Sequence, residues 1–183
     1  MIYVIRHGQT DWNIQKRVMG RHDEPLNETG LHQAEEAKNN LMNTKIDIII
    51  CSPLKRARQT AEVINEGRNI PIVYDDRITE RDFGEFEGKQ TKDFDFKEFW
   101  NFYKNEQYQR AENIQSFFER IDGFLNDIIK EYKGKNVLVV AHGGVSIPIN
   151  CFFNKKIPEG SLIDAGVSLG NCQVLSYDPN YLG

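Results

Sequence analysis

The sequence predicts an α/β protein of three layers, an α/β/α sandwich in which helices cover both faces of a mainly parallel sheet. Two observations carry this prediction. Short apolar runs typical of buried strands alternate along the chain with segments whose apolar residues recur at helical spacing. One of these runs, residues 137–141 (VLVVA), is apolar throughout, which is typical of a central parallel strand. The length of 183 residues fits one domain with a modest insertion, so we expect a single domain over residues 1–183.

The first part of the chain contains three predicted strands and two predicted helices. The strands are short apolar runs at residues 2–5, 46–50 and 70–74. Pro71 lacks an amide hydrogen, which favours an edge or a strand start for the third run. A helix is expected after Asn27, a suitable N-cap, because Leu31, Ala34 and Leu41 then share one face. A second helix is expected where apolar residues recur at steps of three and four: Leu54, Ala57, Ala61 and Ile64.

The second part of the chain begins with an aromatic segment that lacks a clear period. Gly84 and Gly88 mark turns, and the aromatic residues are Phe83, Phe86, Phe94, Phe96, Phe99, Trp100, Phe102 and Tyr103. We predict a small helical insertion over about residues 83–112. It is expected to pack as a cap on a small core of its own or to line the substrate pocket, and both readings can hold for different residues. The cap is the favoured reading, and the segment is expected to set substrate choice.

The remaining elements are a long helix, the central strand and a final strand. Apolar residues at helical spacing from Ile114 to Tyr132 predict an amphipathic helix that ends near Gly134. Residues 145–153 form an apolar stretch after the central strand. Residues 172–177 alternate between apolar and polar side chains, as in a strand.

Composition excludes several classes of function. The 23 basic and 27 acidic residues give a net charge of -4, which argues against nucleic acid or an anionic membrane as a partner. No apolar run approaches the length of a membrane span, and the start MIYVIRHG does not resemble a signal peptide. Cys51, Cys151 and Cys172 are odd in number and lack CxxC spacing, so we expect reduced thiols and a cytoplasmic protein.

A candidate site follows from where the predicted strands end. In open α/β sheets, ligands bind beyond the carboxyl ends of the strands. Three predicted strands are followed by residues 6–8 (RHG), 52–56 (SPLKR) and 142–144 (HGG). This places two histidines and two arginines on one rim, where guanidinium groups and helix N-termini bind anions such as phosphate.

The residue types on this rim suit phosphoryl transfer. A neutral imidazole is a good nucleophile toward phosphorus, and Gly8 next to His7 leaves room for a phosphoryl group. The leaving alkoxide needs a proton, so a carboxylic acid should lie nearby. Glu80 is the candidate, but the residues alone do not distinguish it from the neighbouring Asp82, Glu85 and Glu87.

Four ordered blocks resemble the histidine phosphatase superfamily, in its phosphoglycerate mutase-like branch. Residues 6–13 (RHGQTDWN) are similar to its RHGxTxxN signature, and residues 52–60 (SPLKRARQT) resemble its second motif. Glu80 with residues 83–88 (FGEFEG) resembles the segment that bears its acid, and residues 140–144 (VAHGG) its last motif. The resemblance implies a phosphoglycerate mutase-like fold for the chain.

The resemblance also implies roles for single residues. His7 would be the nucleophile that becomes phosphohistidine, and Glu80 would be the general acid and base. Arg6, Arg56 and His142 would hold the phosphoryl oxygens. Further contacts with the substrate would come from Gly8, Asn13 and Gly143. The resemblance implies no metal and no cofactor.

The expected activity is hydrolysis of a small phosphorylated metabolite. Mutases of the family carry a longer chain between the acid and the last histidine, and the interval from Glu80 to His142 is short here. Two alternatives stay open: mutase-type phosphoryl transfer, and a phospholigand-binding homologue without catalysis, which would have lost His7 or the acid. A phosphatase of phosphoproteins is a third option, and a homodimer is an open possibility for the assembly.

Other basic residues are expected to lie in solvent. His32 falls on the predicted helix after Asn27. His22 lies in a loop after the first motif, where contact with a substrate is the less favoured alternative. Five further cations are expected to be mostly solvated, although one of them could meet a second anionic group of the substrate: Arg21, Lys55, Arg58, Arg77 and Arg81.

Overall fold

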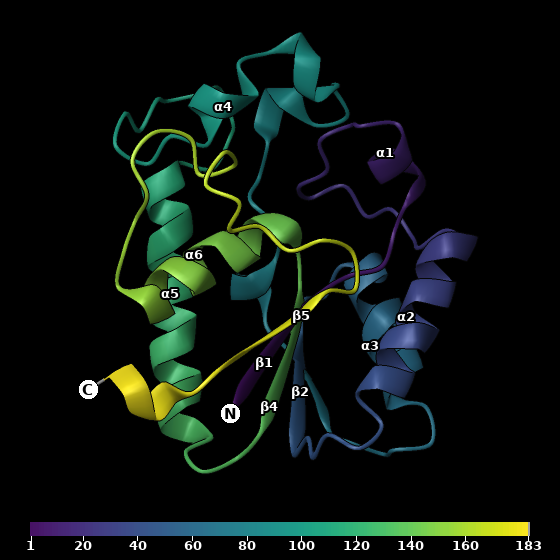
Figure 1. Ribbon diagram of the computed structural model, residues 1–183. Helices are drawn as coiled ribbons and strands as arrows, with labels where there is room; N and C mark the ends of the chain where they lie inside the picture. The colour runs from purple at the N-terminus through teal and green to yellow at the C-terminus, as the bar shows by residue number, and fades with distance from the viewer. Residues whose placement is uncertain (183) are drawn as a thin grey trace.

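The computed structural model describes residues 1–182, and at its centre lies a sheet of five strands (Figure 1). Their order is β3–β2–β4–β1–β5, and β5 alone runs antiparallel to its neighbour. The strands are β1 Ile2–Arg6, β2 Ile48–Cys51, β3 Ile72–Tyr74, β4 Val137–Ala141 and β5 Val174–Tyr177. The central position and complete burial of β4 confirm the prediction made from its apolar run.

Helices cover both faces of the sheet, which confirms the three-layer prediction (Figure 1). Helices α2 (Glu28–Asn40) and α3 (Lys55–Asn65) lie on one face, and α5 (Ile114–Glu131) and α6 (Gly143–Asn154) lie on the other. Two short helices, α1 (Asp11–Ile14) and α4 (Phe96–Phe99), lie near the carboxyl end of the sheet. The 3₁₀ segments are η1 Asp76–Ile78, η2 Gly84–Phe86, η3 Thr91–Asp93 and η4 Pro179–Leu182.

Local sequence explains where several of these elements begin. The Asn27 side chain accepts a hydrogen bond from the Gly30 amide at 2.8 Å, which confirms Asn27 as the N-cap of α2. Asn113 caps α5 in the same way, with its side chain accepting from the amide of Gln115. The final strand starts at Val174, later than expected, because Cys172 has a φ of 53° and no extended strand accommodates that backbone.

The alternation of side chains along each strand fills a separate core on each face of the sheet. Val137 and Val139 of β4 pack with α5 and α6, and Leu138 and Val140 pack with α2 and α3. Both faces of β4 are thus covered, which is why its sequence is apolar throughout. The side chains of the candidate site follow β1, β2 and β4, at the carboxyl end of this sheet.

The aromatic insertion does not form a small core of its own, so that part of the prediction is wrong. Phe99 and Trp100 belong to the same buried cluster as Phe117 of α5, with 6.0 Å between the ring centroids of Trp100 and Phe117. Large rings adjacent to an apolar helix bury more surface by joining the existing core than by forming a second one.

Two further expectations concern the cysteines and the membrane. Cys51, Cys151 and Cys172 are all free thiols, as expected. In the described residues, no helix combines the length and the apolar character that a membrane crossing requires.

Candidate active site

The register of the parallel strands brings three motif ends together. The His7 amide donates to the Ala141 carbonyl at 3.0 Å, and the Ser52 amide donates to the Val140 carbonyl at 3.0 Å. His7, Ser52 and His142 therefore follow adjacent strands at one edge of the sheet. The rings of His7 and His142 are both buried, and their centroids lie 5.2 Å apart.

The surroundings of His7 fix its tautomer and its charge. Its Nδ1 lies 2.7 Å from the Gly8 carbonyl oxygen, and because a carbonyl only accepts, Nδ1 carries the proton. The lone pair is then on Nε2. Burial, together with the charges of Arg56 and Arg6, lowers the pKa of His7 well below its ordinary value. His7 is therefore a neutral imidazole with Nε2 in its nucleophilic form.

His142 is held in the opposite tautomer by two neighbours. Arg56 Nε donates to His142 Nδ1 at 3.3 Å, so the proton of the neutral ring is on Nε2, which lies 2.7 Å from Ser52 Oγ. Burial and the Arg56 charge lower the pKa of His142 well below its ordinary value. Ser52 lies in the second motif, but no pattern in the sequence singled it out as a partner of His142.

Arg6 and Arg56 differ in their relation to a cavity at the site, because Arg6 lines it and Arg56 does not. Arg6 lines this cavity of about 400 Å³ together with His7. Its Nη1 donates to the Leu169 carbonyl at 2.9 Å, but its buried Nε has no hydrogen-bond partner within residues 1–182. Arg56 is fully buried, donates to the carbonyls of Gly20 and His22, and has a pKa lowered to about 10 by burial. Direct contact of Arg56 or His142 with a substrate stays a prediction.

Glu80 lines the same cavity as His7. It is 7% exposed, and it accepts hydrogen bonds from the amides of Arg81 at 2.9 Å and Gly144 at 2.8 Å. Burial raises the pKa of Glu80, and the two amides and the charges of Arg56 and Arg6 oppose this shift. A raised pKa favours the protonated form that a general acid requires.

The structure separates Glu80 from the acidic residues near it in sequence. Glu87 accepts hydrogen bonds from the amides of Gly20, Arg21 and Phe83, so it ties the loop after the first motif to the acid-bearing segment. Asp82 accepts from the Gly84 amide, and Glu85 accepts from the Gln109 amide. Of these four carboxylates, Glu80 is the one that lines the cavity.

Two of the glycines near the site, Gly144 and Gly8, are explained by close approach. A Cβ at residue 144 would lie 2.2 Å from Glu80 Oε1 and 2.6 Å from Cη2 of Trp100. A Cβ at residue 8 would lie 2.4 Å from the Gly30 carbonyl oxygen, so this glycine is required by packing rather than by space in the cavity. The Gly8 amide donates to Thr60 Oγ1, and its predicted contact with substrate stays a prediction. Gly143 begins α6 and lines the cavity.

Asn13 also lines the cavity, next to an asparagine that sequence reasoning missed. Asn13 Oδ1 accepts from the Thr10 amide at 3.1 Å and from Asn171 Nδ2 at 3.3 Å. Asn171 Nδ2 also donates to the His7 carbonyl at 2.9 Å. Asn171 comes from the loop before β5, outside every motif, so no sequence signal pointed to it.

The outer walls of the cavity are aromatic and basic. Phe83, Phe96 and Trp100 of the insertion line it, whereas Phe86 and Phe94 stack on each other at 4.2 Å between centroids. The pocket-lining reading therefore holds for part of the aromatic segment, whereas Phe86 and Phe94 pack against the shared core. Two exposed cations at residues 16 and 17, which the sequence did not single out, also line the cavity: Lys16 and Arg17.

The expectation that Arg81 is solvated is wrong, because it is 1% exposed. Its Nε donates to the Glu112 carbonyl at 2.9 Å, its Nη1 donates to the Phe99 carbonyl, and its guanidinium carbon lies 3.7 Å from the centroid of the Phe99 ring. Carbonyl oxygens and an aromatic face can satisfy a buried guanidinium without an adjacent carboxylate. Burial lowers the pKa of Arg81 to about 9.

The other basic residues expected in solvent are exposed, except for Arg77, which is half-buried. His22 and His32 are exposed, and the His22 ring stacks on Trp12 with 4.1 Å between the centroids. Arg21, Lys55 and Arg58 are exposed as well. Arg77 pairs with Asp75 at 2.8 Å and with Asp127 at 2.6 Å.

These features define the chemistry that the cavity can support. A neutral imidazole, an arginine Nε–H without a partner and a carboxyl group with a raised pKa line one space. This combination suits attack on a phosphorus centre, stabilisation of its anionic oxygens and protonation of a leaving group. Residues 1–182 contain no cluster of three or more His, Cys, Asp or Glu side chains arranged to hold a metal ion.

Comparisons with known proteins agree with this chemistry. A Bacillus subtilis protein named uncharacterized phosphatase PhoE is 41% identical, covering 78% of this chain and 71% of the relative. A protein of Enterobacter sp. (strain 638) named probable phosphoglycerate mutase GpmB is 29% identical, covering 97% and 84%. The solved structure of YhfR from Bacillus stearothermophilus superposes with a TM-score of 0.80 at 32% identity, covering 88% of this chain and 82% of that one.

The family model of branch 1 of the histidine phosphatase superfamily matches residues 2–181, which is nearly the whole chain. The matched relatives carry phosphatase and mutase names, which together support a phosphatase or mutase enzyme. The extent of this match, with the motif residues gathered at one cavity, shows that the chain belongs to the histidine phosphatase superfamily, branch 1.

Proposed function

We propose that the protein is a phosphomonoesterase that hydrolyses a small phosphorylated metabolite through a phosphohistidine on His7. The observation that carries the proposal is the state of His7: a neutral imidazole, protonated on Nδ1, beside the unpartnered Nε–H of Arg6. A buried N–H without a partner costs free energy, and an anionic oxygen in the cavity would satisfy it.

In the first step, His7 Nε2 attacks phosphorus and the bond between phosphorus and the ester oxygen breaks. The departing oxygen takes the proton of the Glu80 carboxyl group. Arg6, Arg56 and His142 stabilise the charge on the phosphoryl oxygens, with the amide of Gly143 and the side chain of Asn13. One well-placed arginine is worth about 10³–10⁵ in rate for phosphoryl transfer, and a positioned general acid about 10²–10⁴.

In the second step, the Glu80 carboxylate takes a proton from water as the water oxygen attacks phosphorus. The bond between phosphorus and Nε2 breaks, inorganic phosphate leaves, and His7 returns to its neutral form. Glu80 returns to its protonated form, so the cycle closes without a metal or a cofactor. The burial that raises the pKa of Glu80 supports both halves of this role.

The substrate that we propose carries a second anionic group besides its phosphate. Lys16 and Arg17 line the cavity, and within the described residues neither forms an ion pair with a carboxylate. A phosphoglycerate, the compound in the name of the Enterobacter relative, carries a carboxylate of this kind. The aromatic wall formed by Phe83, Phe96 and Trp100 also accommodates an apolar group.

The second candidate is mutase-type transfer, in which a substrate hydroxyl takes the phosphoryl group in place of water. The name of the Enterobacter relative favours this candidate, and the name of the Bacillus subtilis relative favours hydrolysis. A cytoplasmic location stays a prediction based on the three free thiols.

The test is a panel of phosphomonoesters in water enriched in ¹⁸O: phosphoglycerates, sugar phosphates and nucleoside phosphates, ranked by kcat/KM. A phosphatase releases phosphate with one ¹⁸O atom, and the doubly anionic esters should rank highest. A mutase would instead return an isomeric ester without ¹⁸O. Binding of these esters without turnover would support the homologue without catalysis.

A further inference from the structure

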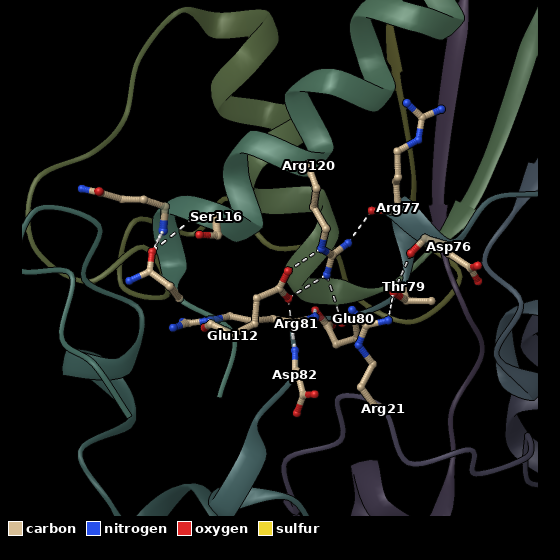
Figure 2. A network of polar contacts seen from close by, with 12 residues as sticks. Arg21, Asp76, Arg77, Thr79, Glu80, Arg81, Asp82, Glu112, Ser116 and Arg120 are labelled. Atoms are coloured by element: carbon tan, nitrogen blue, oxygen red, sulfur yellow. Dashed lines mark hydrogen bonds and ion pairs between the residues drawn. The ribbon is translucent and has the colours of Figure 1, made fainter. Parts of the chain in front are cut away.

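The segment that carries Glu80 is held by a network of side chains that lies outside the cavity. Figure 2 shows this network, in which Arg120 of α5 extends toward residues 77–82. We infer that Arg120 and its partner Glu112 are positioning residues, which fix Glu80 for proton transfer through its backbone. This inference rests on the proposed role of Glu80 as the general acid.

Arg120 contacts the acid-bearing segment at two carbonyl groups. Its Nη1 donates to the Arg77 carbonyl, and its Nη2 donates to the carbonyl of Glu80 itself at 3.2 Å. These contacts hold the backbone three residues before the acid and at the acid itself. A planar guanidinium with donors in a fixed fork can hold two carbonyls at a set separation, which a lysine cannot do.

Glu112 orients Arg120 and contacts the same segment on its other side. Its carboxylate accepts from Arg120 Nε at 2.6 Å and from Nη2 at 2.9 Å, and the two side chains are only 17% and 16% exposed. Glu112 Oε2 also accepts from the Asp82 amide at 3.3 Å, and the Glu112 amide donates to the Asp82 carbonyl at 2.9 Å. The pair is therefore hydrogen-bonded to the backbone both at Glu80 and at Asp82.

The same network joins the acid to the aromatic insertion. Arg81, the residue after the acid, donates from Nε to the Glu112 carbonyl and from Nη1 to the Phe99 carbonyl. Its own amide is one of the two that bind the Glu80 carboxylate. A displacement of the backbone at residue 80 or 81 would therefore move the carboxyl group relative to His7.

The experiment measures how strongly catalysis depends on the leaving group. An alkyl phosphate needs a general acid, whereas p-nitrophenyl phosphate barely does, so the ratio of their kcat/KM values reports proton transfer. A misplacement of a catalytic group by about 1 Å can lower the rate about 100-fold. Arg120→Gln should therefore lower kcat/KM about 10- to 100-fold for the alkyl phosphate. For p-nitrophenyl phosphate the decrease should be less than about threefold. Arg120→Lys should recover only part of the ratio. Full recovery would overturn the inference, because charge alone would then suffice.

A matched control is Arg68→Gln. Arg68 likewise donates to two backbone carbonyls, those of Leu41 at 3.1 Å and Thr44 at 2.7 Å, but it does not line the cavity. Its replacement should lower the thermal midpoint and leave the leaving-group ratio unchanged. If Arg120→Gln behaves in the same way, its role is structural only and the inference is overturned.

Two further variants separate the possible failures. Glu112→Gln removes the negative charge of the pair and keeps the size of the side chain and the hydrogen bonds of the residue 112 backbone, so it should lower the same ratio even if Arg120→Gln does not fold. In a Glu80→Gln background, Arg120→Gln should not lower the ratio any further. If Glu80→Gln itself leaves the ratio at the wild-type value, the acid of the proposed function is wrongly assigned. If Glu80→Gln lowers it and neither Arg120→Gln nor Glu112→Gln does, only the present inference fails.

Discussion

Replacing Gly144 by alanine adds a single methyl group against the general acid. The new Cβ would lie 2.2 Å from Glu80 Oε1 and 2.6 Å from Trp100 Cη2. An ordinary contact between carbon and oxygen requires about 1 Å more than the first distance, so the carboxyl group or the helix terminus must move by about that amount. The amide of residue 144, which donates to Glu80, is still present in alanine, so the change is steric.

A displacement of about 1 Å in a catalytic group can cost about 100-fold in rate, which corresponds to about 2.7 kcal/mol of transition-state stabilisation. We therefore expect Gly144→Ala to lower kcat/KM for alkyl phosphates by about this factor and to affect p-nitrophenyl phosphate much less. The assay is release of inorganic phosphate from both esters under the same conditions. The free energy of unfolding should be measured in parallel by urea titration.

Gly123→Ala is the matched control for this substitution. Gly123 lies within α5, and a Cβ there would have no atom within 4 Å. Alanine is the better helix former by about 1 kcal/mol, so this variant should be more stable and fully active. Wild-type kcat/KM for alkyl phosphates in Gly144→Ala would refute the reasoning, because the carboxyl group would then not need its present position.

Three other predictions concern pH, the basic wall and the insertion. Burial lowers the pKa of His7 and His142 well below about 6.5. As the pH falls below that value, the imidazoles therefore become protonated in the unfolded chain and not in the folded one. The free energy of unfolding should then decrease by about 1.4 kcal/mol per pH unit for each of the two histidines. Urea titrations near pH 7.5 and 5.5 check this, and His142→Gln should show a shallower slope than the wild type. Lys16→Gln should raise KM about tenfold for a phosphoglycerate and less for an alkyl phosphate that has no second anionic group. Equal increases in KM for the two esters would contradict the proposed site for a second anion. We also expect the insertion to be more mobile than the sheet, so amide hydrogen exchange should be faster in residues 90–110 than in β1 and β4, and uniform protection would contradict this expectation.

Much of the site consists of residues that come directly after strands, which is why the sequence could predict it. A parallel sheet brings the residues after its strands to one edge, so the positions of His7, Ser52 and His142 in the chain already implied their proximity. The choice of acid could not be made in this way. Glu80, Glu85 and Glu87 are the same residue type, and only their surroundings distinguish them: the amides from which each carboxylate accepts, and whether it lines the cavity.

The features that the sequence did not predict depend on contacts between distant segments. Arg81 is buried because Glu112 and Phe99 offer carbonyl oxygens, and no local pattern indicates such partners. Asn171 reaches the His7 carbonyl from a loop more than a hundred residues further along the chain. The merging of the aromatic insertion with the core likewise depends on the position of Phe117 on α5.

The central claim is that the phosphoryl group passes through the imidazole of His7. The most direct measurement is rapid quenching of the protein during turnover of a phosphate-labelled substrate, followed by denaturation and mapping of the label. The account predicts label on His7 that survives alkali and is lost in acid, as expected of phosphohistidine, and no label in His7→Ala. Wild-type turnover by His7→Ala, or label that maps to another residue, would contradict it.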